Sequence, residues 1–270
     1  MKHRLNYTRH RKPIHGFTLI ELLVVIAIIA LLLSIIIPAL RTAKRIANGT
    51  VCTSNNRQLM LAWCAYAGDN NDHLVGAGTA LPTDFHFMYD WVGTPINENG
   101  SYRIDTLDDR LRGIRIGRLF PYTKDTKVYH CPTDRRLQDS RGQFAAYRSY
   151  SIQGFMNGYW GEGARPYVNV SKHSQIELPS SKIVCVEEAD PRGFNWGNWN
   201  LPLHEPDVWG DWLAIWHGER STFGYADGHA ELHKWKDDTP MLMTQALAPY
   251  RIETVNSVDR QYMQRAIKPR

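Results

Sequence analysis

An unbroken apolar run near the N-terminus places the strongest constraint on how this chain folds. From Phe17 to Ile37 there are 21 residues, of which only Thr18, Glu21 and Ser34 are polar. A helix rises about 1.5 Å per residue, so a run of this length spans roughly the 30 Å hydrocarbon core of a bilayer. The sequence therefore predicts a transmembrane helix.

The charges that flank the run predict the direction of that helix. Residues 1–16 contain five cationic side chains and no acidic one: Lys2, Arg4, Arg9, Arg11 and Lys12. Fewer cations follow the run, namely Arg41, Lys44 and Arg45. The flank with more cations stays in the cytoplasm. We therefore expect a single-pass protein of the inner (cytoplasmic) membrane whose head lies outside the cytoplasm.

Glu21 is the one ionisable side chain within the run. A carboxylate there costs a few kcal/mol on membrane insertion, so it needs a partner. The segment contains no Lys, Arg or His, which leaves a lipid headgroup, another subunit or a new N-terminus made by cleavage. Cleavage between Gly16 and Phe17 fits best, because it places an α-ammonium four residues before Glu21 and because a small residue suits a peptidase.

The stretch GFTLIELLVVIAII, which begins at Gly16, resembles the processing and assembly segment of type IV prepilins and type II secretion pseudopilins. The resemblance covers residues 16–40. It implies that a prepilin peptidase cuts after Gly16 and methylates the amine of Phe17, and that Glu21 neutralises the N-terminus of a neighbouring subunit. Pro38 falls where such pilins carry a helix-loosening proline. The leader is longer than the commonest pilin leaders, and an uncleaved signal anchor is the alternative.

The charge balance argues against nucleic acid as a partner. The chain has 32 Lys and Arg against 27 Asp and Glu, but five of the bases lie in the leader, so the processed chain holds 27 of each. The basicity is thus a property of the leader and not of the head. The partners implied by the resemblance are the prepilin peptidase/methylase, the inner membrane, and copies of this chain or other pilin-like subunits in a filament.

Four segments are expected along the chain: a removed leader (1–16), a transmembrane or assembly segment (17–37), a helix continuation that packs on the head (38–68), and an extracytoplasmic head (69–270). The helix should loosen at Gly49. The expected fold class is α+β, with a long N-terminal helix packed on an antiparallel β-sheet head, as in pilins. The continuation carries apolar side chains at helical spacing, either Leu59, Trp63 and Tyr66 or Met60, Cys64 and Ala67.

The clearest local fold is a hairpin across residues 222–235. Asp227 and Gly228 separate two alternating runs, which predicts a two-residue type I′ turn. Such a turn would place Phe223 opposite Leu232 on the apolar face of the hairpin.

A second resemblance involves the same turn. His217, nine intervening residues and Asp227-Gly228 are similar to the H-x9-DG element of a pilin-like group found mainly in planctomycetes, verrucomicrobia and their relatives. That group also tends to show Cys-x-x-Asn after the helix and Cys-Pro before the middle strands. The corresponding residues here are Cys52 with Asn55, and Cys131 with Pro132. The resemblance implies no biochemical role.

All four cysteines lie on the side of the membrane where disulfides persist. Cys52 and Cys64 are 12 residues apart on one helix, which separates them by roughly 18 Å, whereas a disulfide needs Cα atoms within about 7 Å. We predict a bridge between Cys52 and Cys131 that ties the helix to the head. Cys185, in the expected strand 182–186, is predicted to be a buried thiol, with a bridge to Cys64 as the alternative.

No metal or cofactor is expected. His217 and Asp227 could join His229 and His233 as ligands, but the last two are about 13 Å apart along one strand and do not converge. Asp227 is sufficiently explained by the turn, and His217 by a hydrogen bond near it. Calcium binding at residues 69–72 is a weak alternative to ordinary turn chemistry.

No enzyme activity is expected either. The Gly-x-Ser-x-Gly and His-Glu-x-x-His motifs and a phosphate-binding glycine loop are absent from the sequence. Glu187, Glu188 and Asp190 contain the pair of acids that a glycosidase needs. Adjacent acids on a strand point to opposite faces, however, so we interpret them as a solvated strand end.

Tryptophans gather in one stretch of the head: Trp196, Trp199, Trp209, Trp212 and Trp216. They form a candidate ligand surface that would stack on sugars, although packing of a loop-rich head is the preferred interpretation.

The expected function is that of a structural subunit, a pilin or pseudopilin, in a type IV pilus-like or type II secretion filament. The subunit could also be a minor one that caps the filament. The alternative is a membrane-anchored extracytoplasmic polymer- or carbohydrate-binding protein, or an enzyme, with a Trp-rich head.

Overall fold

The computed structural model describes residues 18–80, 89–101, 106–136, 147–158, 169–190, 198–205, 207–237 and 252–270. The predicted cleavage residues Gly16 and Phe17, and Trp196, lie outside this set. The chain divides into two compact units, Met1–Lys44 and Arg45–Arg270. The second unit is called the head below.

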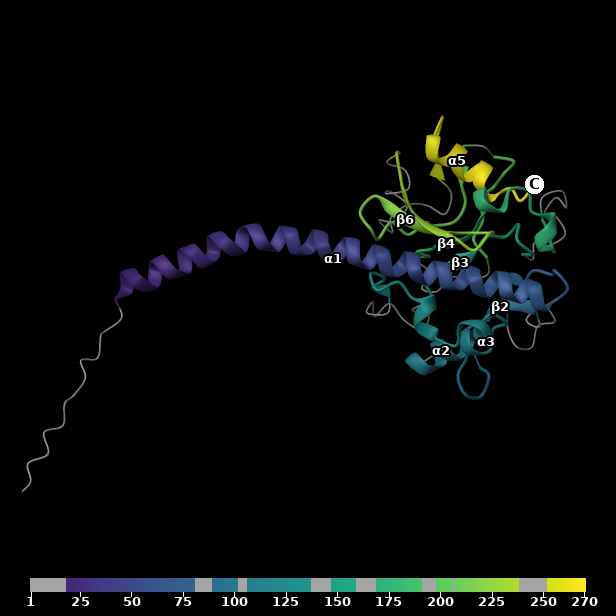
Figure 1. Cartoon of the computed structure of the whole chain (residues 1–270), viewed down its shortest axis with the longest axis horizontal. Helices are drawn as coiled ribbons and strands as arrows, with labels where there is room; N and C mark the ends of the chain where they lie inside the picture. The colour runs from purple at the N-terminus through teal and green to yellow at the C-terminus, as the bar shows by residue number, and fades with distance from the viewer. Residues whose placement is uncertain are drawn as a thin grey trace, which may run out of the picture. The chain divides into compact units, whose positions relative to one another are not determined.

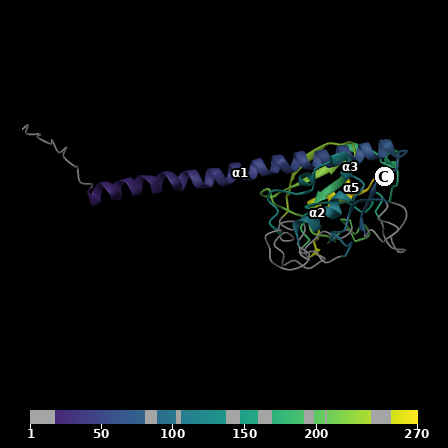
Figure 2. The same ribbon diagram turned by 90° about the horizontal axis from the view of Figure 1, so that it is seen from below.

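One helix, α1 (Leu19–Asp69), contains nearly all of the apolar run and the predicted continuation (Figures 1 and 2). The helix is continuous through Pro38 and also through Gly49, where we predicted a loosening. Residues 18–47 are all exposed. The buried positions of α1 follow them, within the head: Gly49, Cys52, Asn56, Leu59, Met60, Ala62, Trp63 and Ala67.

The centre of the head is a four-stranded sheet in the order β3-β4-β6-β7, in which every neighbouring pair is antiparallel. Its strands are β3 (Tyr150–Ile152), β4 (Ile183–Glu187), β6 (Arg220–Tyr225) and β7 (Ala230–Lys234). The strands predicted at 148–152 and 182–186 correspond to β3 and β4. This sheet, together with α1, confirms the predicted α+β class.

Shorter elements surround the sheet. β1 (Gly76–Ala80) pairs in parallel with β2 (Asp90–Gly93), and β5 (Val208–Trp209) pairs in antiparallel with β8 (Ile252–Glu253). The remaining helices are α2 (Leu107–Arg115), α3 (Phe120–Thr123) and α5 (Val258–Ile267), with 3-10 turns η2 (Thr126–Tyr129), η4 (His173–Gln175) and η5 (Pro179–Ser181).

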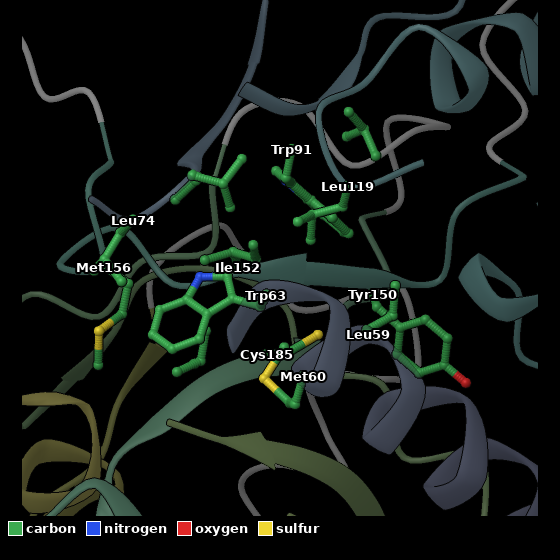
Figure 3. Packing of buried hydrophobic residues seen from close by; sticks show 14 of the residues in the cluster. Leu59, Met60, Trp63, Leu74, Trp91, Leu119, Tyr150, Ile152, Met156 and Cys185 are labelled. Atoms are coloured by element: carbon green, nitrogen blue, oxygen red, sulfur yellow. The ribbon is translucent and has the colours of Figure 1, made fainter. Parts of the chain in front are cut away.

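The head portion of α1 packs on one face of the sheet (Figures 1 and 3). Both predicted stripes take part: Leu59, Met60 and Trp63 are fully buried in one apolar cluster with Tyr150 and Cys185 of the sheet. Cys64 and Tyr66 lie at its edge and are partly buried. The helix therefore contributes a broader apolar face than either stripe alone.

A second apolar cluster covers the opposite face. It joins sheet residues to the tryptophan-rich stretch and to α5, and Figure 1 shows α5 on the side of the sheet away from α1. Its members include Ile183, Val186, Phe223, Trp199, Trp209, Trp212, Trp235, Met263 and Ile267. The sheet is thus buried on both faces.

The hairpin between β6 and β7 forms, but its predicted register is wrong by one residue. Thr222 lies opposite Leu232, and Phe223 lies opposite Glu231. The turn is a three-residue loop: the Gly228 N–H donates to the Tyr225 carbonyl (3.0 Å), and Gly228 has a φ of 94°. This is a type I turn followed by a left-handed glycine, whose odd loop length shifts the pairing relative to a two-residue turn.

A register irregularity in β4 decides which side chains face α1. The pairing with β6 shifts between Ile183 and Cys185. As a result Ile183 belongs to the tryptophan-rich cluster, whereas Cys185 belongs to the α1 cluster. Side chains alternate along a strand, so Glu187, two residues further, lies on the α1 side.

Candidate functional site

Glu21 has a hydrogen-bonding partner in its own segment. The Thr18 backbone N–H and hydroxyl both donate to Glu21 Oε2 (2.8 and 2.7 Å), and the Glu21 N–H donates back to Thr18 Oγ1 (3.2 Å). This reciprocal arrangement is a capping box at the start of α1. We predicted that Glu21 has no partner in its own segment, because the segment holds no cation. That prediction is wrong, since a hydroxyl and a backbone amide also satisfy a carboxylate.

The apolar part of α1 has no covering in the single chain. By length and composition α1 is long and apolar enough to cross a membrane. Its large side chains are exposed along the whole run, as with Leu19 (78%) and Ile35 (67%). Burial of such side chains is worth about 1.5–3 kcal/mol each, so this surface requires lipid or other protein.

Four potential metal-ligating side chains meet inside the head. Cys52 comes from α1, Cys131 from the loop after η2, Glu187 from the end of β4 and His217 from the turn before β6. All four are buried, and one ligand atom from each lies within 4.8 Å of the others. We call these residues the Cys-His-Glu cluster.

The closest contacts within the cluster form a chain. The Cys52 and Cys131 sulfurs are 2.8 Å apart, Cys131 Sγ lies 3.6 Å from His217 Nε2, and His217 Nε2 lies 3.0 Å from Glu187 Oε1. Both cysteines are free thiols in this structure. The predicted pair is therefore brought together without the predicted bridge, and the disulfide stays a prediction.

Neighbouring groups hold the cluster in place. The Thr222 N–H donates to the second oxygen of Glu187 (2.8 Å), and the Ser149 hydroxyl accepts from the Cys131 N–H (2.9 Å). A Cβ at Gly49 would lie 3.7 Å from the His217 ring and 3.3 Å from Leu232. The distance to the His217 ring is an ordinary contact, whereas the distance to Leu232 is tight, so a side chain at Gly49 would press on Leu232 of β7.

Burial and mutual interactions shift the protonation of the cluster. Burial alone would lower the pKa of His217, but hydrogen bonding to Cys131 and Glu187 raises this pKa to about 10. Burial raises the pKa of the Cys131 thiol far above its ordinary value. Burial and the nearby Cys52 and Glu187 likewise raise the pKa of Tyr150, which is fully buried.

The other histidines considered as ligands lie elsewhere. His229 pairs with Asp227 across the hairpin turn (2.5 Å), and His233 stacks on Tyr262 with ring centroids 4.4 Å apart. The ligand set with His217 that we weighed does not assemble. The H-x9-DG element thus has two ends with separate contacts, His217 in the cluster and Asp227-Gly228 in the turn, and its relation to the pilin-like group stays a prediction.

The acids at the end of β4 and just after it are not a solvated strand end. Glu187, Glu188 and Asp190 are all buried, so that interpretation is wrong. Glu188 accepts a hydrogen bond from the Ser151 hydroxyl, which also accepts from Arg148 (2.9 Å). Burial and the nearby Asp211 raise the pKa of Glu188 to about 8. Sequence spacing gave no sign of these partners, which come from β3 and the following loops.

The candidate tryptophan ligand surface is also corrected. Trp199, Trp209 and Trp212 are at most 6% exposed and belong to the apolar cluster behind the sheet. Trp216 is half-buried beneath the Arg136 guanidinium, 5.5 Å from the ring centroid. Among the described tryptophans of this stretch the rings therefore serve packing, as the preferred interpretation held.

The remaining predicted sites have local explanations. Cys185 is a buried thiol, as predicted, and Cys64 lies near the Ala226 carbonyl (3.6 Å). In the 69–72 segment, Asp72 accepts hydrogen bonds from the Ser174 N–H (3.1 Å) and hydroxyl (2.5 Å), and Asn70 donates to the Tyr66 carbonyl (2.7 Å). These contacts are those of a helix end.

Comparison with known proteins finds likeness at the N-terminus. The family described as the prokaryotic N-terminal methylation motif matches residues 11–37. The type IV wide pilus major component PilA4 of Thermus thermophilus is 48% identical over 58 residues, which cover 22% of this chain and 44% of that protein. No solved structure matches the chain. The two matches support the predicted type IV prepilin-like N-terminal segment, and neither is described as an enzyme.

Proposed function

Because the chain carries a type IV prepilin-like N-terminal segment, we propose that it is a structural subunit of a type IV pilus-like or type II secretion filament. The matched relative is itself named a pilus component, although this chain spans less than half of its length. In the proposed role the apolar part of α1 first anchors the chain in the inner membrane. It then bundles with the same part of other subunits, while the head faces outward.

The wholly exposed apolar run is the observation that carries this proposal. Residues 19–47 make up more than half of the length of α1 and bury no side chain in the single chain. A lipid bilayer covers such a helix during anchoring, and a bundle of identical helices covers it equally well. Glu21 favours the bundle, because a carboxylate in hydrocarbon is costly unless a neighbouring group satisfies it.

The proposal includes processing by a prepilin peptidase between Gly16 and Phe17. Cleavage exposes the Phe17 amine next to the capping box. In the filament Glu21 would then exchange its contacts with Thr18 for the N-terminus of a neighbouring subunit. Intact mass and N-terminal sequencing of the protein from its native membrane test this step: N-methylated Phe17 supports it, and a chain that begins at Met1 opposes it.

Assembly is tested by substituting Glu21. We expect Glu21→Ala to abolish filaments in electron micrographs and in the fraction sheared from cells, with the head still folded. Ser34→Ala, which removes the other mid-run polar group, is the matched control and should assemble normally. Filaments of Glu21→Ala at the wild-type level would contradict the proposal.

The rival function is a membrane-anchored binder of an extracytoplasmic polymer. It predicts that Glu21→Ala keeps its binding to cell-wall or capsular polysaccharide, because the head is unchanged. Burial of Trp199, Trp209 and Trp212 removes three of the five rings of the stacking surface that suggested it. The filament subunit is therefore the function we favour.

A further inference from the structure

We propose that Cys52, Cys131, Glu187 and His217 form a structural metal site for a zinc-like divalent cation. Nothing in the N-terminal likeness to pilins bears on this site, which lies wholly within the head. The four residues are separated by 79, 56 and 30 positions in sequence, and the fold brings all four to one buried point. Among the residues that the structure describes, this is the one group of at least three such ligands.

The set of donor atoms suits zinc. Two thiolates, an imidazole and a carboxylate are all ligands that Zn²⁺ accepts, and structural zinc sites have four protein ligands in a tetrahedron. Thiolates disfavour Mg²⁺ and Ca²⁺, which prefer oxygen. Four protein ligands leave no open position for substrate, so the site would serve structure rather than catalysis.

The distances require only small movements. Tetrahedral zinc, with Zn–S near 2.3 Å and Zn–N near 2.0 Å, sets its ligand atoms roughly 3.3–3.8 Å apart. The Cys131–His217 separation of 3.6 Å already fits. The Cys52–Cys131 (2.8 Å) and His217–Glu187 (3.0 Å) separations would each lengthen by about 1 Å or less. The remaining pairs lie within 4.8 Å.

The surroundings also fit a cation. Cys52 and Cys131 are fully buried and belong to the same apolar cluster as Tyr150, and Glu187 and His217 are buried beside them. A bound cation would balance three anionic ligands that are otherwise costly to bury.

The site would fasten α1 to the head. Its ligands come from the helix, from the loop after η2, from β4 and from the turn before β6, so one ion would join four segments. Metal-binding free energy then contributes directly to folding. A filament subunit pulled through its helix would benefit from such a connection, but the site does not depend on filament assembly.

The test uses the full chain purified in mild detergent without chelators or reducing agents. Elemental analysis by mass spectrometry should find about one zinc ion per chain, as for a closed four-ligand site. Replacement of zinc by Co²⁺ should give the visible and sulfur-to-cobalt absorption bands of tetrahedral thiolate coordination. Maleimide labelling should leave Cys52 and Cys131 unmodified until a chelator is added.

Matched variants locate the ion. Cys52→Ser and His217→Gln should lose the metal, whereas Cys64→Ser and His229→Gln, which change a cysteine and a histidine outside the cluster, should retain it. Glu187→Gln keeps the size of the side chain and one acceptor oxygen for the Thr222 N–H but removes the negative charge, so it should fold and still bind the ion at least tenfold more weakly. Tryptophan fluorescence reports whether each variant is folded.

Two results would overturn the site. Wild-type protein without metal, whose unreduced digest yields a linked Cys52–Cys131 peptide, would establish the disulfide instead. Metal that persists in folded Cys52→Ser or His217→Gln protein would place the ion elsewhere. The wild-type measurements decide the matter even where a variant fails to fold.

Discussion

Gly224 shows how closely single residues control the contact between α1 and the sheet. It lies in β6, directly beneath the helix, and a Cβ there would come within 2.5 Å of Met60 Cγ and 2.6 Å of Asn56 Oδ1. Real side chains do not pack this closely, so the Met60 and Asn56 side chains, or the backbone that carries them, would have to move. The absence of a side chain at this point allows Met60 to be fully buried.

We expect Gly224→Ala to destabilise the head by about 1–3 kcal/mol, the usual cost of inserting an extra group into a packed core. Gly68→Ala is the matched control, because Gly68 lies in the last turn of α1 with no atom within 4 Å of its added Cβ. That control should be neutral or more stable by up to about 1 kcal/mol, since alanine favours helix over glycine. Denaturant unfolding followed by tryptophan fluorescence measures both, and equal stabilities would contradict the argument.

At the scale of elements, the head portion of α1 is held through one face only. Trp63 is fully buried against the sheet, whereas Leu61, two residues away, is 52% exposed. Residues two apart on a helix point in different directions, so the helix turns one side to the sheet and the other to solvent.

Trp63→Ala should therefore cost about 3–5 kcal/mol, the range for removing a buried aromatic side chain. Leu61→Ala should change the free energy of unfolding by no more than about 0.5 kcal/mol, as for surface substitutions. Thermal and denaturant unfolding of the two variants, side by side, checks this. A large loss in Leu61→Ala would mean that α1 is rotated relative to this structure.

The start of α5 is built from two reciprocal acids. The Ser257 hydroxyl and the Asp259 N–H donate to Asp237 Oδ2 (2.6 and 3.1 Å), and the Lys236 and Asp237 N–H groups donate to Asp259 Oδ2 (2.7 Å each). The Ser257 hydroxyl is the main reason that the pKa of Asp237 lies below its ordinary value of 3.8. The ionised form of Asp237 therefore stabilises the folded state.

This gives a pH dependence with a definite sign. A carboxyl whose pKa is lowered by folding contributes stability above its unfolded pKa, and that contribution is lost as the pH falls through the folded pKa. We expect the wild-type unfolding temperature to fall below about pH 4 more steeply than that of Asp237→Asn. Both proteins would be measured from about pH 2.5 to about pH 7, the range in which carboxyl groups titrate. Identical pH profiles would rule out this role for Asp237.

At the scale of the whole molecule, the chain divides between Lys44 and Arg45. Both apolar clusters lie in the second unit, and the side chains of residues 18–44 contribute nothing to either. The head should therefore need no part of the apolar run for its stability.

A fragment of residues 45–270 should accordingly fold cooperatively and stay in solution without detergent, whereas the full chain should require detergent. The unfolding temperature of the fragment should match that of the head in the full chain within a few degrees, because no buried contact is removed. Size-exclusion chromatography and thermal unfolding provide the measurements. An aggregated or non-cooperative fragment would show that the first unit supports the fold.

Several properties follow from the sequence alone. The apolar run, its Glu21 and its likeness to prepilins depend only on consecutive residues, so the sequence was sufficient for them. The sequence also predicted the strands at 148–152 and 182–186 and both apolar stripes of α1. Periodicity along the chain indicates which side of a helix or strand is buried.

Other properties depended on the tertiary structure. Asp-Gly predicts a two-residue turn from local sequence, yet Gly228 takes the left-handed position of a three-residue loop. The cross-strand partner of Leu232 is therefore Thr222 and not Phe223. The β4 irregularity turned Glu187 toward α1, and α5 covered tryptophans that local sequence left free to face a ligand. Cys52, Cys131 and His217 were each recognisable as candidates, but their meeting with Glu187 was not. These four residues lie in distant segments, and the packing of helix, sheet and loops brings them together. The sequence near each residue does not predict that packing.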